Sequence, residues 1–579
     1  MRVAMSMATS ALIASLGACK SAQDRFGGWK FEDDTFRSID RLDLASAETA
    51  PPKTPDAAAI VDVEIGALVR EYPERLELPL DRVRAEVLSN NLDLEAQLVA
   101  PSIAAADVAA EEAKFEATFF ASFNRNDANF LTNLEAGLPT SQDQFNIGVE
   151  VPLSTGGTIS VSNPLFRADQ AISNVFGDDT WNSQLQFSIS QPLLRGGWLD
   201  ANMHSIRIAR FQGQIVEART KLEVIRVLSA ADRAYWNLYA AWGELDVRRQ
   251  QYELAVRQLE VAQRRVAAGD APELEVVRAE SGVGRTVEAI IVADAILRTR
   301  QRELKRLLNM PDIPIESPTG LVPATLPTPL DLALDPQILA DRAVANRMEM
   351  LELELQLAID ASNISFRRNQ ALPLFAFDYS YSFQGVAGGA GSAYGNLFDS
   401  DFYQLGLTLE IPIGNEAAEA RLRNAVLTRV QRLASRDARR LAIRSEVLDA
   451  LDQLRQSWQR ILAARLEVVL AARTLEGEQR QFEVGLRTST DVLDASTRLA
   501  DARSREVRAL ADWQIGLVDL AFATGTTLGG AKVAFTSGTA PLLATDTNGV
   551  ADVYVADLRA GGALTLVSRT ATGVQSPQA

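Results

Sequence analysis

Apolar residues recur every seven positions along two long stretches of the chain. The two runs are Leu238, Leu245, Tyr252, Leu259 and Val266, and Leu454, Ile461, Val468, Leu475 and Phe482. Gly269 and Gly485 follow the runs, 216 residues apart, and a similar spacing resumes beyond each glycine. Sustained seven-residue repeats are typical of helices packed side by side. The pattern predicts a duplicated pair of long helices, the first reaching from His204 to Ala268, about 100 Å at about 1.5 Å per residue.

Alternating apolar and polar positions predict strands before each helical pair. The clearest runs are Phe375, Phe377, Tyr379, Tyr381 and Phe383, and Leu405, Leu407, Leu409 and Ile411; Leu185, Phe187 and Ile189 repeat the pattern in the first copy. A strand of a transmembrane barrel needs about 9–11 residues with this alternation. A half-buried strand of a soluble sandwich shows the same period, so the alternation by itself is compatible with both.

The first copy contains an insertion between its two strands. Phe119 and Phe375 in the first strands lie 256 residues apart, whereas Pro192 and Pro412 at the ends of the second strands lie 220 apart, which leaves 36 additional residues. The insertion has alternating segments on both sides of the turn at residues 155–158, a hairpin pattern. It either adds membrane strands or prolongs a surface hairpin, and we favour the surface hairpin.

The remaining composition changes divide the chain into segments. A proline-rich stretch connects the two copies, and the last fifty residues are rich in Gly, Thr, Ser and Ala. The predicted segments are 1–18 (lipoprotein signal peptide), 19–79 (lipid-anchored tether), 80–310 (first repeat), 311–335 (connection between repeats), 336–528 (second repeat) and 529–579 (β-type extension).

Charge and the scarcity of reactive side chains narrow the function classes. The formal net charge is −17 and the sequence pI is about 4.8. These values argue against a nucleic-acid partner, because binding to phosphates needs clustered Lys and Arg. An acidic surface attracts cations instead. The chain has one histidine and one cysteine, too few for a histidine-based dyad or for a metal cage of Cys and His. It also lacks a glycine pattern of the kind that binds nucleotide phosphates. We expect neither an enzyme nor a cofactor.

The single cysteine lies at the end of an apolar N-terminal stretch. Arg2, near the start of the chain, is followed by an apolar segment too short to span a bilayer and then by Leu16-Gly17-Ala18-Cys19. This order resembles the signal peptide and lipobox of bacterial lipoproteins. The resemblance implies acylation of Cys19, palmitate included, and Lys20 in place of Asp indicates sorting to the outer membrane. An incidental cysteine is the alternative. Because no later segment forms a long apolar span, any transmembrane part is expected to consist of strands.

Two motifs and the repeated order of elements resemble a known family. Residues 482–495, Phe-Glu-Val-Gly-Leu-Arg-Thr-Ser-Thr-Asp-Val-Leu-Asp-Ala, resemble the second helical hairpin of TolC-type outer-membrane efflux proteins, and residues 188–197 resemble their strand-to-helix junction. The resemblance covers about residues 80–525. It implies an α+β fold: a trimeric 12-stranded transmembrane β-barrel, with four strands from each protomer, continued by a long α-helical coiled-coil barrel.

The same resemblance implies a function. Such a protein is the outer-membrane exit duct of a tripartite efflux or type I secretion system, an efflux transmembrane transporter that passively conducts substrates to the exterior. Its implied partners are two further copies of itself, a periplasmic adaptor (membrane-fusion) protein, an inner-membrane pump indirectly, and outer-membrane lipid. The alternative is a lipid-anchored periplasmic coiled-coil scaffold without channel activity. Drug efflux, metal efflux and protein secretion all stay open for the cargo.

Residues at the helix turns receive roles through the resemblance. The element Val484, Gly485 and Leu486 is implied to dock the adaptor, together with Arg265 and Gly269 of the first copy. The first copy departs from the family pattern, since Ala268 and Asp270 flank its glycine.

A gate and an acidic ring complete the implied site. Glu275 and Arg487 are candidates for an opposite-charge pair between neighbouring hairpins, and Phe482 stands where the family often has tyrosine, without its hydroxyl. Asp491 and Asp494 lie three residues apart on one helix face. In a trimer they would form two rings of carboxylates that favour cations, whereas the alternative for both is a solvated surface acid.

Overall fold

The structure is a computed structural model that describes residues 72–130, 138–170, 179–527, 532–537, 552–557 and 563–566. The chain divides into two compact units, residues 1–64 and residues 65–579, and every described residue belongs to the second. The predicted signal peptide, Cys19 and nearly all of the predicted tether lie outside the described residues.

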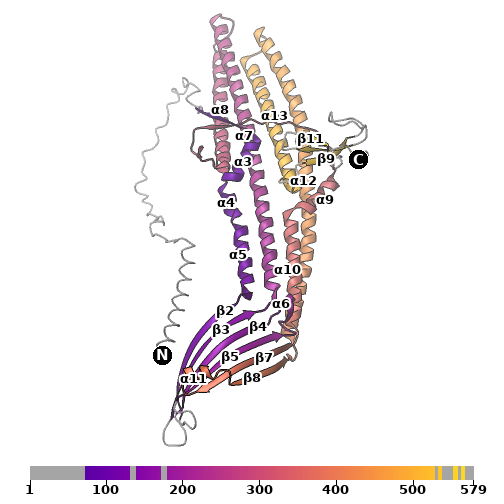
Figure 1. The fold of residues 1–579 in the computed structure, drawn as a ribbon. Coiled ribbons are helices and arrows are strands. Elements are labelled where there is room, and N and C mark those ends of the chain that lie inside the picture. The colour runs from indigo at the N-terminus through magenta and orange to yellow at the C-terminus, as the bar shows by residue number, and fades with distance from the viewer. Residues whose placement is uncertain are drawn as a thin grey trace, which may run out of the picture. The chain divides into compact units, whose positions relative to one another are not determined.

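Four long helices confirm the helical prediction. They are α7 (His204–Ala267), α8 (Leu274–Leu308), α12 (Glu416–Glu483) and α13 (Ser489–Ala523). α7 packs on α8, α12 packs on α13, and α13 also packs on α7 (Figure 1). The seven-residue repeat explains these contacts, because Leu238, Leu245, Leu454 and Ile461 are all buried.

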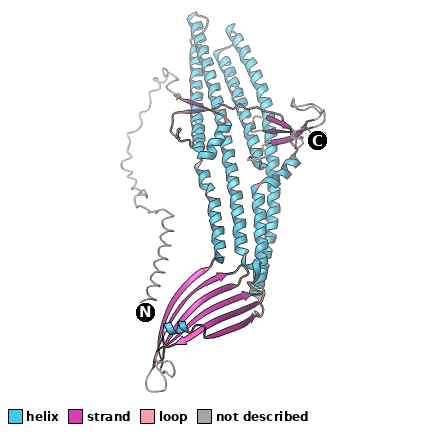
Figure 2. Ribbon diagram, in the orientation of Figure 1, coloured by secondary structure: helices cyan, strands magenta, loops and turns pink. Residues whose placement is uncertain are grey.

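Shorter helices complete the helical part of the described chain. They are α3 (Leu80–Asn90), α4 (Leu92–Leu98), α5 (Ala100–Glu112), α6 (Trp198–Asn202), α9 (Pro336–Asn346), α10 (Met348–Gln370) and α11 (Ala390–Gly395), with a 3₁₀ turn η4 at Ala113–Phe115. α5 packs on α7, α7 on α10 and α10 on α12. Four helices therefore lie in a row at the end of the bundle that meets the strands (Figure 2). No described helix is both long and apolar enough to cross a membrane.

The strands form one six-stranded antiparallel sheet. They are β2 (Thr118–Phe130), β3 (Leu138–Pro152), β4 (Thr158–Gln170), β5 (Asp179–Pro192), β7 (Leu374–Ala387) and β8 (Ser400–Glu410), in the order β2-β3-β4-β5-β7-β8. The prediction of four strands per chain, on which the 12-stranded barrel rests, is therefore wrong. The insertion supplies β3 and β4, which pair within this sheet between β2 and β5. The surface or membrane position of the hairpin stays a prediction. A hairpin outside the sheet and two strands within it show the same alternation of apolar and polar residues, and only the strand pairing distinguishes them.

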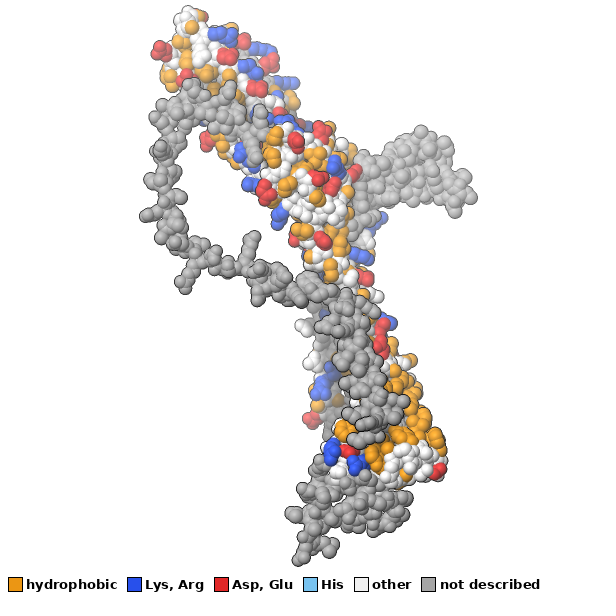
Figure 3. Space-filling model, turned by 60° about the vertical axis from the view of Figure 1, so that its left-hand side comes forward, with side chains coloured by type: hydrophobic (Ala, Val, Ile, Leu, Met, Phe, Trp, Pro, Cys, Tyr) orange, Lys and Arg blue, Asp and Glu red, His pale blue; other side chains and the backbone are white. Residues whose placement is uncertain are grey.

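The sheet has one apolar and one polar face. One row of directly paired residues, one from each strand, is Phe119, Val149, Val161, Phe187, Tyr381 and Tyr403. The neighbouring row on the opposite face is Thr118, Glu150, Ser160, Ser188, Ser380 and Gln404. Phe119 and Tyr403, on the two edge strands, are 67% and 69% exposed. Hydrophobic side chains gather on the surface over the strand end of the molecule (Figure 3). A sheet of a soluble protein would instead bury its apolar face.

Two small sheets complete the described fold. β1 (Arg75–Leu78) pairs in parallel with β6 (Gly320–Pro323), which lies in the predicted connection between the repeats. Both strands are held on α7, where the Tyr235 hydroxyl donates to the Leu78 carbonyl at 3.0 Å and the Trp242 indole to the Leu321 carbonyl at 2.8 Å. Near the C-terminus β9 (Lys532–Ser537), β10 (Asp552–Asp557) and β11 (Ala563–Leu566) form an antiparallel sheet.

A buried ion pair joins α3 to α7 and gives a test of this packing. Arg84 Nε and Nη2 donate to the two carboxylate oxygens of Asp232 at 2.9 and 2.7 Å, and the Asp232 residue is only 2% exposed. Asp232→Ala would leave the guanidinium without its partner. We expect the free energy of unfolding in detergent, followed by circular dichroism, to fall by about 2 kcal/mol, less than for a fully buried pair because Arg84 keeps some solvent contact.

The matched control is Glu223→Ala on the same helix, which removes the exposed pair with Arg226. It is expected to change the free energy of unfolding by less than about 1 kcal/mol. Equal losses in the two variants would contradict a structural role of the Arg84–Asp232 pair.

Candidate functional site at the helix-hairpin tips

The two long-helix hairpins turn at the predicted glycines. Gly269 and Gly485 have positive φ angles of 80° and 78°, the left-handed conformation that glycine adopts without strain. In the first tip Asp270 N donates to Arg265 O at 2.9 Å, and in the second Leu486 N donates to Gln481 O at 2.9 Å. The amides of Gly269 and Gly485 donate to Val266 O and Phe482 O, each at 3.0 Å, and all four bonds satisfy carbonyls at the helix ends in the Schellman arrangement.

Arg265 connects the first tip to the second. Its Nη1 donates to the Phe482 carbonyl at 3.0 Å, and its guanidinium carbon lies 4.8 Å from the centre of the Phe482 ring. Phe482 itself is only 4% exposed. The cation–π contact and the hydrogen bond hold the two hairpins of one chain together. The sequence indicated both residues but not their contact, because they are 217 positions apart.

Glu275 makes a second connection between the hairpins. Its Oε2 accepts a hydrogen bond from the amide of Ser489, the first residue of α13, at 3.0 Å, and its Oε1 accepts from Arg278 at 2.7 Å. A carboxylate is favourable at this position because the N-terminus of a helix carries partial positive charge and unpaired amides. Burial raises the pKa of Glu275, but Ser489 and Arg278 outweigh burial and lower the pKa below its usual value.

Arg487 has its partners within its own hairpin. Its Nε lies 3.1 Å from a carboxylate oxygen of Glu478 and donates to Gln481 Oε1 at 3.0 Å. Within one chain Glu275 and Arg487 therefore do not pair with each other. Glu275 binds Ser489 and Arg278, whereas Arg487 binds Glu478 and Gln481. A pair between hairpins of neighbouring copies stays a prediction.

Asp491 and Asp494 have different surroundings. The Thr488 amide and hydroxyl each donate to Asp491 Oδ2 at 2.9 Å, so Asp491 completes a capping box at the start of α13. The hydrogen bonds from the Thr488 amide and then its hydroxyl lower the pKa of Asp491. Asp494 is exposed, and the described residues offer its carboxylate no hydrogen bond or ion pair. Of the two predicted ring acids, Asp491 is therefore engaged in helix capping and Asp494 is not, and the ring itself stays a prediction.

The second tip presents an apolar surface that the first lacks. Val484 and Leu486, on either side of Gly485, are 69% and 76% exposed. The equivalent positions of the first tip, Ala268 and Asp270, are small or charged. These two exposed side chains coincide with the predicted docking element, which stays a prediction.

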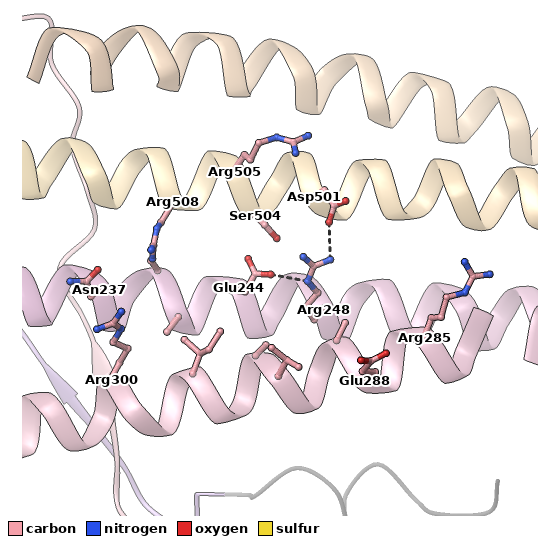
Figure 4. Close-up of a pocket in the computed structure, with 16 residues that line it drawn as sticks. Asn237, Glu244, Arg248, Arg285, Glu288, Arg300, Asp501, Ser504, Arg505 and Arg508 are labelled. Carbon is pink, nitrogen blue, oxygen red and sulfur yellow. Dashed lines mark hydrogen bonds and ion pairs between the residues drawn. The ribbon is translucent and has the colours of Figure 1, made fainter. Parts of the chain in front are cut away.

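A groove that the sequence did not indicate lies between α8 and α13 above α7. It has a volume of 770 Å³ and is lined by several arginines together with Glu244, Glu288 and Asp501 (Figure 4). Arg248 crosses its floor and donates to Glu244 of its own helix at 2.7 Å and to Asp501 of α13 at 3.0 Å. Its residues come from three helices, so no local motif could reveal it. Among the described residues, no group of three or more His, Cys, Asp or Glu could hold a metal ion.

Comparisons with known proteins agree with this geometry. Residues 339–526 match the outer membrane efflux protein family. The outer membrane protein TolC of Vibrio cholerae is 22% identical over 367 residues, which cover 62% of this chain and 79% of that protein. The resemblance to TolC-type proteins that the two motifs indicated is confirmed.

Solved structures share the fold. The outer membrane channel CmeC of Campylobacter jejuni is 15% identical with a TM-score of 0.60, over 78% of this chain and 87% of that one. The open state of the MtrE outer membrane channel of Neisseria gonorrhoeae is 17% identical with a TM-score of 0.57, over 78% and 90%. At these identities the likeness shows the fold.

The carboxylates of the tips give a pH prediction. Asp491 and Glu275 have folded-state pKa values below their usual 3.8 and 4.5, so their ionised forms stabilise the tip at neutral pH. This stabilisation is expected to disappear as the pH falls below about 4.5 and passes through the lowered values. Hydrogen exchange at the first turn of α13, corrected for intrinsic exchange rates, should show protection that is lost in this range.

Two substitutions test which carboxylate is responsible. Asp491→Asn should lower the protection at about pH 6 by about fivefold, since capping interactions are worth about 1 kcal/mol, and should weaken its pH dependence. Asp494→Asn, which removes a charge from the same helix face, should leave the protection unchanged. The assignment fails if Asp491→Asn and the unchanged protein give the same pH profile.

Proposed function

We propose that this outer-membrane efflux protein of the TolC type is the exit duct of a tripartite efflux or type I secretion system. Its outer-membrane location follows from the family. The observation that carries the proposal is the sheet, which exposes an apolar face and ends in two edge strands, β2 and β8, that have no partner on their outer sides among the described strands. Lipid tolerates strands only where every backbone group is paired.

Copies of the chain can pair these edges with one another. Because the sheet has an even number of antiparallel strands, β8 of one copy runs antiparallel to β2 of the next, and the ladder continues across the seam. Head-to-tail contacts of this kind form a ring when the rotation between successive copies closes. We propose a homotrimer, the assembly typical of this family, in which the closed barrel lies in the outer membrane with its apolar face toward lipid.

The helices support the same assembly. α8 and α12 expose large apolar side chains over much of their length: Val277, Ile291, Val292 and Ile296 on α8, and Leu441, Leu448, Leu462, Leu466, Val469 and Leu470 on α12. A single chain leaves these surfaces in water, whereas neighbouring copies would bury them. The helices would then form a tube that extends through the periplasm, built from the repeats at 80–310 and 336–528.

The tips are proposed as the mouth of the tube. A periplasmic adaptor would dock on Val484, Gly485 and Leu486, with a weaker contact at Gly269, and would link the duct to an inner-membrane pump. Arg265 would support docking indirectly, because it holds Phe482 and thereby the second tip in place.

Closure of the mouth would depend on contacts that a partner can break. We propose that Arg487 and Glu275 of neighbouring copies meet when the mouth is closed, exchanging the partners they have within one chain. Exposed pairs contribute about 0–1 kcal/mol each, which suits a gate opened by adaptor binding. Phe482 would contribute packing in place of the hydrogen bond of a tyrosine.

Acylation of Cys19 would anchor the N-terminal segment in the outer membrane. A single acyl chain binds membranes only marginally, so the barrel would provide most of the attachment. The competing scaffold function has no use for a six-stranded sheet with an exposed apolar face, and this observation favours the duct.

Channel activity distinguishes the duct from the scaffold. Protein extracted from membranes in mild detergent is expected to run as a trimer that heating dissociates, and to produce discrete current steps in planar bilayers. A preparation dissociated by heat beforehand is the control and should produce none. A monomeric rod without current steps would overturn the proposed function.

The acidic ring predicts ion selectivity. Asp494→Asn should lower the cation-over-anion permeability ratio, obtained from reversal potentials in a salt gradient, by about twofold or more, because a ring of carboxylates attracts cations. Asp452→Asn, which removes an exposed carboxylate of α12 away from the tip, is the control and should leave the ratio unchanged. An unchanged ratio in Asp494→Asn would remove Asp494 from the pore.

A further inference from the structure

The inserted hairpin separates strands that would otherwise be neighbours. β2 pairs with β3, and β5 pairs with β4 and β7, so β2 and β5 do not touch. A hairpin that merely extended a surface loop would leave β2 paired with β5. β3 and β4 instead pair with their neighbours along almost their whole length. They therefore belong to the continuous sheet of the chain.

The hairpin also continues both faces of the sheet. Val149 and Val161 lie in the apolar row between Phe119 and Phe187, and each is more than one third exposed. On the opposite face the hydroxyls of Ser160 and Ser188 hydrogen-bond across β4 and β5 at 2.6 Å. A peripheral hairpin would not need an exposed apolar row in register with the strands on either side.

The turn of the hairpin is fixed to the end of the sheet that meets the helices. The amide of Trp198 and the side-chain amide of Gln191 both donate to the Thr155 carbonyl, at 2.8 and 3.0 Å. Gly156 has a φ of 87°, and a Cβ there would lie 2.2 Å from the Gly196 carbonyl, so only glycine fits. The hairpin therefore runs the full height of the sheet.

The number of strands also agrees with the width of the helical row. Strands about 4.8 Å apart and tilted by about 40° each occupy about 6 Å of circumference. Six strands then span about 38 Å, against about 25 Å for four. The row α5, α7, α10 and α12, at about 8–10 Å per helix, spans about 32–40 Å. Six strands continue the helical wall without a step at ordinary strand tilt.

We propose that β3 and β4 are wall strands of the assembled pore, so that three copies close an 18-stranded barrel whose lumen is wide enough that it does not restrict cargo. The inference rests on the proposed trimeric duct. About 18 strands leave an open aqueous channel, and the diameter grows roughly linearly with strand number. The circumference above gives about 35 Å between opposite backbones, about 1.5 times the value for 12 strands.

Size selection then falls to the helix tips. The inner face of the barrel is lined by polar side chains such as Glu150, Ser160 and Ser380, which keep the lumen wet. A wide barrel in series with a narrow, gated mouth would pass whatever the open mouth admits, including bulky polymers or polypeptides.

Adjacent positions on β4 test whether the hairpin faces lipid. Val161→Cys and Ser162→Cys place a thiol on opposite faces of one strand, and Phe187→Cys does so on β5 as a reference. Each full-length variant is labelled with bimane, reconstituted into vesicles that contain brominated lipid, and compared with unchanged protein treated in the same way, which reports any label carried by Cys19. Bromolipid should quench the probe at position 161 as strongly as at 187, and should leave the probe at 162 largely unquenched.

Each result decides one of the two proposals. Quenching at 187 but not at 161 would overturn the wall position of the hairpin and leave the duct intact. No quenching at either position would mean that the sheet does not lie in lipid, which overturns the proposed function itself.

Deletion of residues 138–170 tests the width. Because β3 and β4 run in opposite directions, their removal joins β2 to β5 in the correct orientation, through residues 131–137 and 171–178. Polyethylene glycols of increasing size, added on the barrel side of a planar bilayer, report the largest polymer that enters the lumen. The radius at which polymers are excluded should fall by about 1.5-fold in the deletion variant.

An unchanged radius in a conducting deletion variant would overturn the 18-stranded barrel. Overall conductance is a poor readout, because the narrow mouth lies in series with the barrel. If the deletion variant does not assemble, the quenching comparison still decides, since it uses full-length chains with single substitutions.

Discussion

The unpaired backbone along the edges of the six-stranded sheet is the constraint on which the rest of the structure depends. Among the described strands, β2 and β8 are paired on one side only, so every second residue of each directs its amide and carbonyl groups to an outer side without a partner. In lipid, water is not available to replace that partner. The parity of the sheet decides how this constraint can be met. Six strands return the chain to an antiparallel seam, so identical copies can close the ladder, whereas an odd number would bring parallel edges together.

The helices inherit their arrangement from the same sheet. α5, α7, α10 and α12 connect to β2, β5, β7 and β8, and they pack in a row in that order. The outermost connections belong to the edge strands, so a partner that pairs with a free edge also meets an unpartnered helix. The large apolar side chains left exposed on these two helices, Ile103 on α5 and Leu441 on α12 among them, agree with this requirement. A second copy of the chain placed at a sheet edge would therefore pair the free strand and cover the exposed helix at the same time.

At the other end of the bundle the dominant requirement is to satisfy helix termini. The glycines provide left-handed turns, the Thr488–Asp491 capping box satisfies the start of α13, and Glu275 reaches across from the first hairpin to the amide of Ser489. These contacts make the two tips of one chain a single unit. They also separate two acids that look alike in the sequence, because Asp491 is engaged in capping and Asp494 is not.

The sequence by itself determined the long helices, the positions of their turns, the two-faced strands and the family, because each of these follows from short-range periodicity or a contiguous motif. Strand order, the contact of Arg265 with Phe482 and the partners of Glu275 and Arg487 were decided only by the tertiary structure. These features join residues far apart in the chain or depend on which edge lies next to which. The inserted hairpin shows the limit most directly: its alternation is the same in a surface loop and in a barrel wall, and only its pairing between β2 and β5 gives the sheet six strands.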